Sequence, residues 1–186
     1  MATRATIMLG SAFPAAEIGT VGSAGKGARA LAYGADLVID RSQEDFVEAA
    51  MAFTRGRGVD LVIDSLGADV LPRSFDALRP FGRVIDIGEA AGYPDFAVRP
   101  TLYRRSTSYA GFELLHAGPG SRRWRRGERY VVDALARGRL EVPIEGRYPM
   151  ERCADMHRRL EGRGVSGKLL LEVAGLDVVT VLADGR

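Results

Sequence analysis

The sequence contains few of the residues from which disulfide bonds and metal sites are built. Its 186 residues include one cysteine, Cys153, and two histidines, His116 and His157. A single cysteine excludes an internal disulfide, and these three side chains leave a thiolate or imidazole zinc site short of ligands. We therefore expect no bound metal.

Long apolar runs are scarce as well. No stretch approaches the roughly 18 apolar residues that a membrane helix needs, and the apolar part of the opening MATRATIMLG is too short for a secretory signal. The hydrophobic fraction of 46% and the charged fraction of 27% are typical of soluble globular proteins. A chain of this length suits one domain or one and a half, and we expect it in the cytoplasm.

One segment concentrates positive charge, although the formal net charge is only +2. Residues 121–130, SRRWRRGERY, hold five arginines, one glutamate and a tryptophan. Such a segment can bind nucleic acid or another anionic polymer, with a steep salt dependence, or it can be the solvated start of a helix. The balanced charge elsewhere and the lack of a nucleic-acid motif favour the solvated helix. We expect no nucleic-acid partner.

Strand-like and helix-like segments alternate along most of the chain. The strand-like runs are rich in Val, Ile and Leu without alternating polar residues, which is typical of strands buried on both faces of a parallel sheet. Between them, apolar residues recur at helical spacing. This order predicts an α/β fold with a doubly wound, mostly parallel sheet. The predicted strands lie at residues 18–21, 36–40, the start of 59–67, 83–88, 109–115 and 168–173.

Several residues suggest where helices begin or end. Ser42 and Asp45 resemble a capping pair for the helix that follows them. The apolar stripe of the next helix is expected to end at Leu78. Pro149 fits the first position of a later helix, and the basic segment is expected to lead into a helix over residues 126–136.

A glycine-containing stretch, EIGTVGSAGKGARALAYGADLVID at residues 17–40, lies between two strand-like runs. A dinucleotide phosphate cradle needs G-x-G-x-x-G directly after a strand, whereas here the spacing is G-x-x-G-x-x-G and Gly19 falls inside the strand. The stretch instead fits the second strand-to-helix turn of such a fold, which faces the adenosine ribose. Ser23 and Lys26, without a nearby acidic residue, suit the 2′-phosphate of NADP. An ordinary turn with a surface lysine is the alternative.

Five segments together carry a family resemblance. They are IGTVGSAGK, GADLVID, GRGVDLVIDSLG, SFDALRPFGRVIDIG and GVSGKLLLEV, in this order. The chain from about residue 17 to 173 resembles the cofactor-binding domain of the zinc-independent medium-chain dehydrogenase/reductases, in the quinone oxidoreductase branch related to zeta-crystallin and to polyketide enoyl reductases. The resemblance implies a Rossmann-like domain and NADPH-dependent hydride transfer to a quinone or another α,β-unsaturated carbonyl. It also implies a homodimer formed through the edge strand at 109–115.

The resemblance implies a set of cofactor-binding residues. Ser23 and Lys26 would hold the 2′-phosphate, Ser65 and Gly67 would lie near the adenosine and ribose, and Ile87 and Gly88 would border the nicotinamide. The full expected set is Gly22, Ser23, Lys26, Ser65, Gly67, Ile87, Gly88, Phe112 and Lys168. For Gly67 and Gly88 the alternative is a turn glycine with positive φ, and the matching context favours the cofactor role. No catalytic residue is assigned, because nothing in their spacing separates Tyr109 and His116 from packing residues.

The chain departs from this family near its start. Members carry an N-terminal substrate domain, a first strand, a glycine-rich cradle and a first helix, whereas seven residues between Gly10 and Ile18 are too few for a parallel crossover. We expect residues 1–16 to be irregular or a strand remnant, 17–173 to form the NADP-binding domain, and 174–186 to be an extension with a possible extra strand. Residues 6–9 or 176–183 would then fill the vacant sheet position.

Two functions are therefore open at this point. The chain is an NADPH-dependent oxidoreductase represented by its cofactor domain, with the substrate domain supplied by a separate chain. Alternatively, it is a degenerate, non-catalytic domain that serves as a dimerisation or binding module. Binding of NADPH distinguishes the two.

Overall fold

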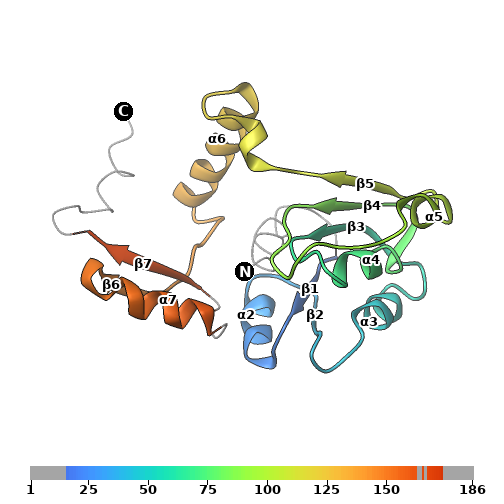
Figure 1. Ribbon diagram of the computed structural model, residues 1–186, viewed down its shortest axis with the longest axis horizontal. Helices are drawn as coiled ribbons and strands as arrows, with labels where there is room; N and C mark the ends of the chain where they lie inside the picture. The colour runs from blue at the N-terminus through green and yellow to red at the C-terminus, as the bar shows by residue number, and fades with distance from the viewer. Residues whose placement is uncertain (1–15, 163–164, 166, 174–186) are drawn as a thin grey trace. The chain divides into compact units, whose positions relative to one another are not determined.

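The computed structural model describes residues 16–162, 165 and 167–173, and it has the α/β character that the sequence predicts (Figure 1). The chain divides into two compact units, residues 1–140 and 141–186, and each is described by itself. The predicted sheet-filling segments at residues 6–9 and 176–183 lie outside the described residues. No helix within the described ranges is long and apolar enough to cross a membrane.

The first unit alternates strands with helices. Its strands are β1 (Ile18–Val21), β2 (Leu37–Asp40), β3 (Val59–Asp64), β4 (Leu78–Asp86) and β5 (Ser108–Gly111). Its helices are α2 (Gly27–Ala32), α3 (Phe46–Phe53), α4 (Val70–Ser74), α5 (Val98–Tyr103) and α6 (Arg122–Ala136), with short 3-10 turns η1 (Ala24–Lys26) and η2 (Leu114–Ala117).

All strand pairs of the first unit are parallel, which confirms the predicted sheet type. β1 pairs with β2, with Val21 opposite Asp40. β4 lies between β3 and β5 in a second sheet, with Val84 opposite both Val62 and Tyr109. Among the described residues, neither β1 nor β3 has a strand on its other edge. Parallel pairing brings the carboxyl ends of neighbouring strands to the same edge of each sheet.

The core of this unit consists of the apolar strand centres and the helix faces that cover them. Ile39, Leu71, Leu78 and Val84 are fully buried. Ile39 of β2 packs with Phe46 and Ala50 of α3, and residues of β1 and β3 join the same cluster. Burial of each such side chain stabilises the fold by about 1.5–3 kcal/mol, so this shared cluster is a main link between the two sheets.

The second unit is a small parallel β-α-β element. It contains β6 (Ile144–Pro149), η3 (Met150–Arg152), α7 (Cys153–Glu161) and β7 (Lys168–Glu172). Tyr148 of β6 lies opposite Leu171 of β7. Arg159 of α7 donates to Glu145 and to the Tyr148 hydroxyl, each at 3.0 Å, so the helix is fastened to β6 by polar contacts as well as by packing.

Some predicted helix boundaries are wrong for local reasons. Asp45 alone caps α3, since its carboxylate accepts from Val47 N and Glu48 N, while Ser42 bonds back to Asp40. Leu78 opens β4 instead of closing a helix, and Pro149 ends β6. The helix predicted from residue 126 begins at Arg122, because the Ser121 hydroxyl accepts from Trp124 N at 3.1 Å.

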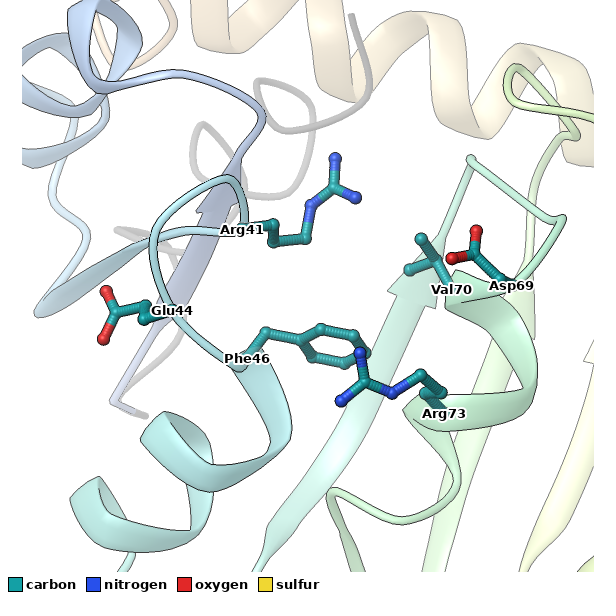
Figure 2. Close-up of a pocket in the computed structure, with 6 residues that line it drawn as sticks. All are labelled: Arg41, Glu44, Phe46, Asp69, Val70 and Arg73. Carbon is teal, nitrogen blue, oxygen red and sulfur yellow. The ribbon is translucent and has the colours of Figure 1, made fainter.

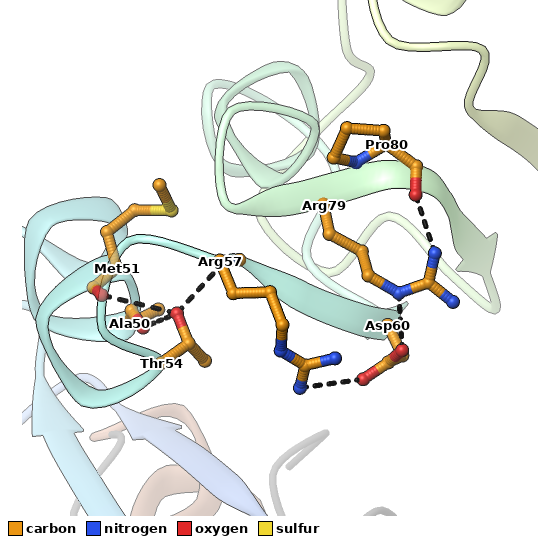
Figure 3. A network of polar contacts seen from close by, with 8 residues as sticks. Ala50, Met51, Thr54, Arg57, Asp60, Arg79 and Pro80 are labelled. Carbon is orange, nitrogen blue, oxygen red and sulfur yellow. Dashed lines mark hydrogen bonds and ion pairs between the residues drawn. The ribbon is translucent and has the colours of Figure 1, made fainter.

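A polar network fixes the amino end of β3 (Figure 3). The Thr54 hydroxyl accepts from Gly58 N at 3.0 Å, which closes the turn between α3 and β3. Asp60 accepts from both Arg57 and Arg79, and the Arg79 hydrogen bond is the main cause that lowers the pKa of Asp60. These contacts hold β3 against the start of β4.

Candidate functional site

Three strands of the first unit end in the same tripeptide, Val-Ile-Asp. The aspartates are Asp40 after β2, Asp64 after β3 and Asp86 after β4. Each carboxylate accepts a hydrogen bond from the backbone amide two residues ahead, at 2.8–3.1 Å. This is the Asx-turn geometry that aspartate favours after a strand. The sequence analysis assigned these three aspartates no role, although the repeated Val-Ile-Asp tripeptide was a signal that could have revealed one.

The loops that follow β3 and β4 are joined to each other by backbone hydrogen bonds. We call residues 65–68 and 87–92 the β3–β4 loops. Ala90 N donates to Ser65 O at 3.0 Å, Ala91 N to Leu66 O at 2.8 Å, and Ala68 N to Gly92 O at 2.7 Å. Asp64 is 4% exposed, and its carboxylate binds Gly67 N as well as Leu66 N. The β3–β4 loops therefore form a pre-organised surface at the carboxyl edge.

Gly67 occupies a position that only glycine fits. Its φ is +66°, and a Cβ placed there would lie 2.4 Å from Gly92 O. The positive φ agrees with the turn-glycine interpretation and does not decide whether a ligand also approaches. Gly88 has no such close approach, since its nearest neighbour would be Ser65 O at 3.7 Å.

Ser65 is the first residue of the β3–β4 loops, directly after Asp64. Its Oγ is buried and makes no hydrogen bond to any described residue. A buried hydroxyl without a partner is costly by about 1–3 kcal/mol, and such groups in native proteins usually serve a ligand or a water molecule. The surrounding loops hold this hydroxyl at the edge where parallel sheets bind ligands.

Tyr109 on β5 supports the loop after β4. Its hydroxyl donates to the Asp86 carboxylate at 2.8 Å, and its ring makes edge contacts with Phe75 and Phe96. Burial, followed by the contact with Asp86, raises the pKa of Tyr109 to about 12. The phenol is therefore protonated and held by Asp86 across the physiological range.

The turn after β1 brings Gly22, Ser23 and Lys26 together. Lys26 N donates to Ser23 O at 3.1 Å within η1, and α2 begins directly afterwards. Ser23 is exposed and Lys26 is half-buried. With the segment after β2, residues 41–44, this turn at 22–26 forms what we call the β1–β2 turns.

The end of β2 contains two more polar atoms without partners. Asp40 Oδ2 and Arg41 Nε are both buried and have no hydrogen bond to any described residue. Arg41 also lines a cavity of about 100 Å³ between the end of β2 and the start of α4 (Figure 2). The other lining residues are Glu44, Phe46, Asp69, Val70 and Arg73. Hence the segment after β2, at residues 41–44, and the start of α4 lie on either side of this cavity.

The remaining predicted residues divide between the two units. Ile87 follows β4 and is 37% exposed, and Phe112 follows β5 and is 54% exposed. Lys168, in contrast, is the first residue of β7 in the second unit. The predicted positions of the first unit thus follow the carboxyl ends of β1, β3, β4 and β5, and Lys168 belongs to the second unit.

A known family covers most of this chain. The sequence model of a family described as zinc-binding dehydrogenase matches residues 33–171. The chain belongs to this family. The resemblance inferred from the five sequence segments is thereby confirmed.

The relatives include quinone oxidoreductases and a 2-haloacrylate reductase. The chain is 32% identical over 171 residues to 2-haloacrylate reductase of Burkholderia sp, covering 84% of this chain and 48% of that protein. It is 31% identical over 157 residues to quinone oxidoreductase 1 of Escherichia coli K12, covering 83% and 48%. The chain thus spans about half the length of these curated relatives.

Solved structures of this family share the fold. The crystal structure of Escherichia coli quinone oxidoreductase complexed with NADPH matches with a TM-score of 0.82 and 29% identity, over 92% of this chain and 53% of that one. The crystal structure of a 2-haloacrylate reductase matches with a TM-score of 0.80 and 32% identity, over 90% and 53%. The Rossmann-like fold is therefore confirmed.

The family description mentions zinc, and the residues can be tested for it. Within the part of the chain that the structure describes, no group of three or more His, Cys, Asp or Glu side chains could hold a metal ion. These donors do not fit zinc, which takes three or four protein ligands. We assign zinc no role in the described residues.

Proposed function

We propose that this chain is the NADPH-binding part of an oxidoreductase that reduces a quinone or another α,β-unsaturated carbonyl compound. The single observation that carries the proposal is the buried, unpartnered Ser65 hydroxyl, held by the β3–β4 loops at the carboxyl edge of a parallel sheet. Membership of the dehydrogenase family and the likeness to an NADPH complex support the same ligand.

The predicted residues take roles along the length of the cofactor. Ser23 and Lys26 bind the 2′-phosphate, since a hydroxyl and an ammonium group are suited to a phosphate and an acid is not. Ser65 and the backbone at Gly67 bind the ribose and adenosine portion. Ile87, Gly88 and Phe112 border the nicotinamide, while the role of Lys168 stays a prediction from the family resemblance.

The cofactor supplies the hydride, and the protein positions it. Bound NADPH would supply a hydride from its nicotinamide C4 for an electron-poor carbon of the acceptor. The chain's contribution is to hold the ring by the fixed β3–β4 loops and to exclude water with apolar groups such as Ile87 and Phe112. Asp64 and Asp86 act through the backbone, because their carboxylates fix the turns that carry Gly67 and Gly88.

The acceptor site and the assembly belong to the same proposal. Because the chain spans about half of its relatives, we infer that a separate substrate domain completes the acceptor site. No described strand pairs with the outer edge of β5, and Phe112, Leu114 and Leu115 beyond it are exposed, which favours a homodimer through this strand. If the chain binds no NADPH, this dimerisation is its alternative function as a non-catalytic module. We place the protein in the cytoplasm.

Titration with NADPH tests the proposed function. A single site of micromolar Kd should enhance NADPH fluorescence and stabilise the chain by about 2.7 kcal/mol at a hundredfold excess over Kd. Ser65→Ala should weaken binding about fivefold without destabilising the fold, because its hydroxyl has no protein partner.

A matched control is available in a second buried serine. The Ser74 hydroxyl donates to Val70 O at 3.1 Å, so Ser74→Ala should lower stability and leave the Kd for NADPH unchanged. Absence of any NADPH signal up to millimolar concentration would contradict the proposal and support the non-catalytic module.

A further inference from the structure

The Arg41 side chain lies over the end of the neighbouring strand β1, which the sequence around it does not predict. Its backbone N donates to Val21 O at 3.0 Å, which extends the β1–β2 ladder beyond the end of β2. Its side chain turns back over the end of β1, because a Cβ added at Gly22 would lie 3.7 Å from Arg41 Nη2. The guanidinium therefore lies against the first residue of the turn that carries Ser23 and Lys26.

The Arg41 guanidinium still has an unused donor. Its Nε is buried and lacks a hydrogen-bond partner among the described residues. Arg73, which lines the same cavity, is committed differently: it forms an ion pair with Asp45, and its guanidinium carbon lies 5.0 Å from the centre of the Phe46 ring. Figure 2 shows the Arg41 side chain pointing away from Glu44.

The charges around the cavity explain why a ligand there needs this arginine. Glu44 and Asp69 also line it, and both oppose an anion. Asp45 is compensated by Arg73, whereas Asp40 bonds only Ser42 among the described residues, through one oxygen, and also opposes an anion. A phosphate near Gly22 thus depends on the positive charge and the planar donor group of Arg41, which matches phosphate oxygens better than a lysine does.

We propose that Arg41 binds the 2′-phosphate of NADPH, together with Ser23 and Lys26, and is the main residue that selects NADPH over NADH. This inference rests on the proposed function and adds a residue from a second strand to the phosphate site. The 2′-phosphate supplies the acceptor that the buried Nε lacks.

Binding of matched ligand pairs tests this role. We would measure the Kd of the full chain and of Arg41→Gln for NADPH and NADH, and for 2′,5′-ADP and 5′-AMP, by calorimetry. Arg41→Gln should weaken binding of NADPH and 2′,5′-ADP tenfold or more, and that of NADH and 5′-AMP by no more than about twofold. Arg41→Lys should restore part of the loss.

Arg73→Gln is the control from the same cavity. It should lower stability, because it breaks the Asp45 contact, while the ratio of NADPH to NADH affinity stays as in the unchanged chain. If Arg41→Gln weakens both ligands of a pair equally, or neither, the inference is overturned and NADPH binding itself still stands. If the unchanged chain binds neither NADPH nor 2′,5′-ADP, the proposed function fails and this inference fails with it.

Discussion

The carboxyl ends of β3 and β2 carry the same tripeptide but differ in how completely their polar groups are bonded. At the end of β3, one carboxylate oxygen of Asp64 accepts from two backbone amides, the Ser74 hydroxyl lies 3.4 Å from the other oxygen, and the β3–β4 loops are joined by backbone hydrogen bonds. After β2, one oxygen of Asp40 and the Nε of Arg41 are buried without partners. The Asp64 carboxylate is thus bonded within the protein, whereas Asp40 and Arg41 are bonded only in part; the Ser65 hydroxyl in the β3–β4 loops also has no partner among the described residues.

This difference distinguishes the polar groups that stabilise the fold from those that are available to a ligand. A buried carboxylate that accepts several amides fixes a loop, and its removal should cost stability. A buried donor or acceptor without a partner is destabilising in the free protein, so it is expected where a ligand supplies the missing bond. Loss of the Asp64 carboxylate should therefore destabilise the fold more than loss of the Asp40 carboxylate.

The largest expected effect is that of Asp64→Ala. It leaves the amides of Leu66 and Gly67 without an acceptor in a buried site, so the free energy of unfolding should fall by about 3 kcal/mol. The corresponding Asp40→Ala should cost about 1 kcal/mol, because only Ser42 loses its acceptor. Urea denaturation measures the free energy of unfolding of both variants. Equal losses of stability would contradict the difference between the two strand ends.

Two glycines provide the next contrast. In Gly67→Ala the new methyl group would collide with Gly92 O and the positive φ would be strained, so stability should fall by at least about 2 kcal/mol. In Gly22→Ala the methyl group meets only the movable end of Arg41 at an ordinary contact distance, and stability should change by less than about 0.5 kcal/mol. Thermal unfolding of the two variants measures both changes in stability. A large loss of stability in Gly22→Ala would show that the β1–β2 turns are as rigid as the β3–β4 loops.

Tyr109→Phe should cost about 1 kcal/mol at pH 7, since Asp86 loses its hydroxyl donor. The effect has a defined pH dependence. The folded pKa of Tyr109 is raised to about 12 against an unfolded value near 10, so its contribution is fully present below pH 10 and is lost as the pH rises towards 12. Unfolding measured from pH 8 to 12 should show the unchanged chain losing more stability than the variant; parallel curves would contradict this assignment.

The smallest expected effect lies at the amino end of β3. Asp60 is paired with Arg57 and Arg79 but is more than half exposed, so Asp60→Asn should cost less than about 1 kcal/mol. Because the pKa of Asp60 is lowered in the folded chain, its contribution is present above about pH 4 and is lost as the pH falls through the folded value. The variant should bind NADPH as the unchanged chain does, and a changed Kd would show that the site extends to this end.

The parallel α/β fold could be predicted from the sequence, because continuous Val and Ile runs in a protein of this composition are typical of strands buried on both faces of a parallel sheet. It was less reliable where one side chain decides between alternatives. Leu78 satisfies a helical stripe and a strand equally well, and only its parallel pairing opposite Val59 shows that it belongs to β4. Ser42 and Asp45 both suit a cap, and the competing carboxylate of Asp40 takes Ser42.

The candidate site was predictable only in part. The glycines and Ser65 follow strands, which a pattern can show, and the family resemblance gives them roles. The roles of Asp64 and Asp86 depend on which amides their carboxylates reach, and that of Arg41 depends on its side chain turning back over Gly22. These are properties of the folded chain that spacing alone does not contain.

Hydrogen exchange of backbone amides with and without NADPH tests the central claim most directly. The account predicts slower exchange on adding NADPH in the β1–β2 turns and the β3–β4 loops, with no change at the amino ends of the strands, such as residues 54–58. Protection confined to the amino ends, or no protection at any NADPH concentration up to millimolar, would contradict it.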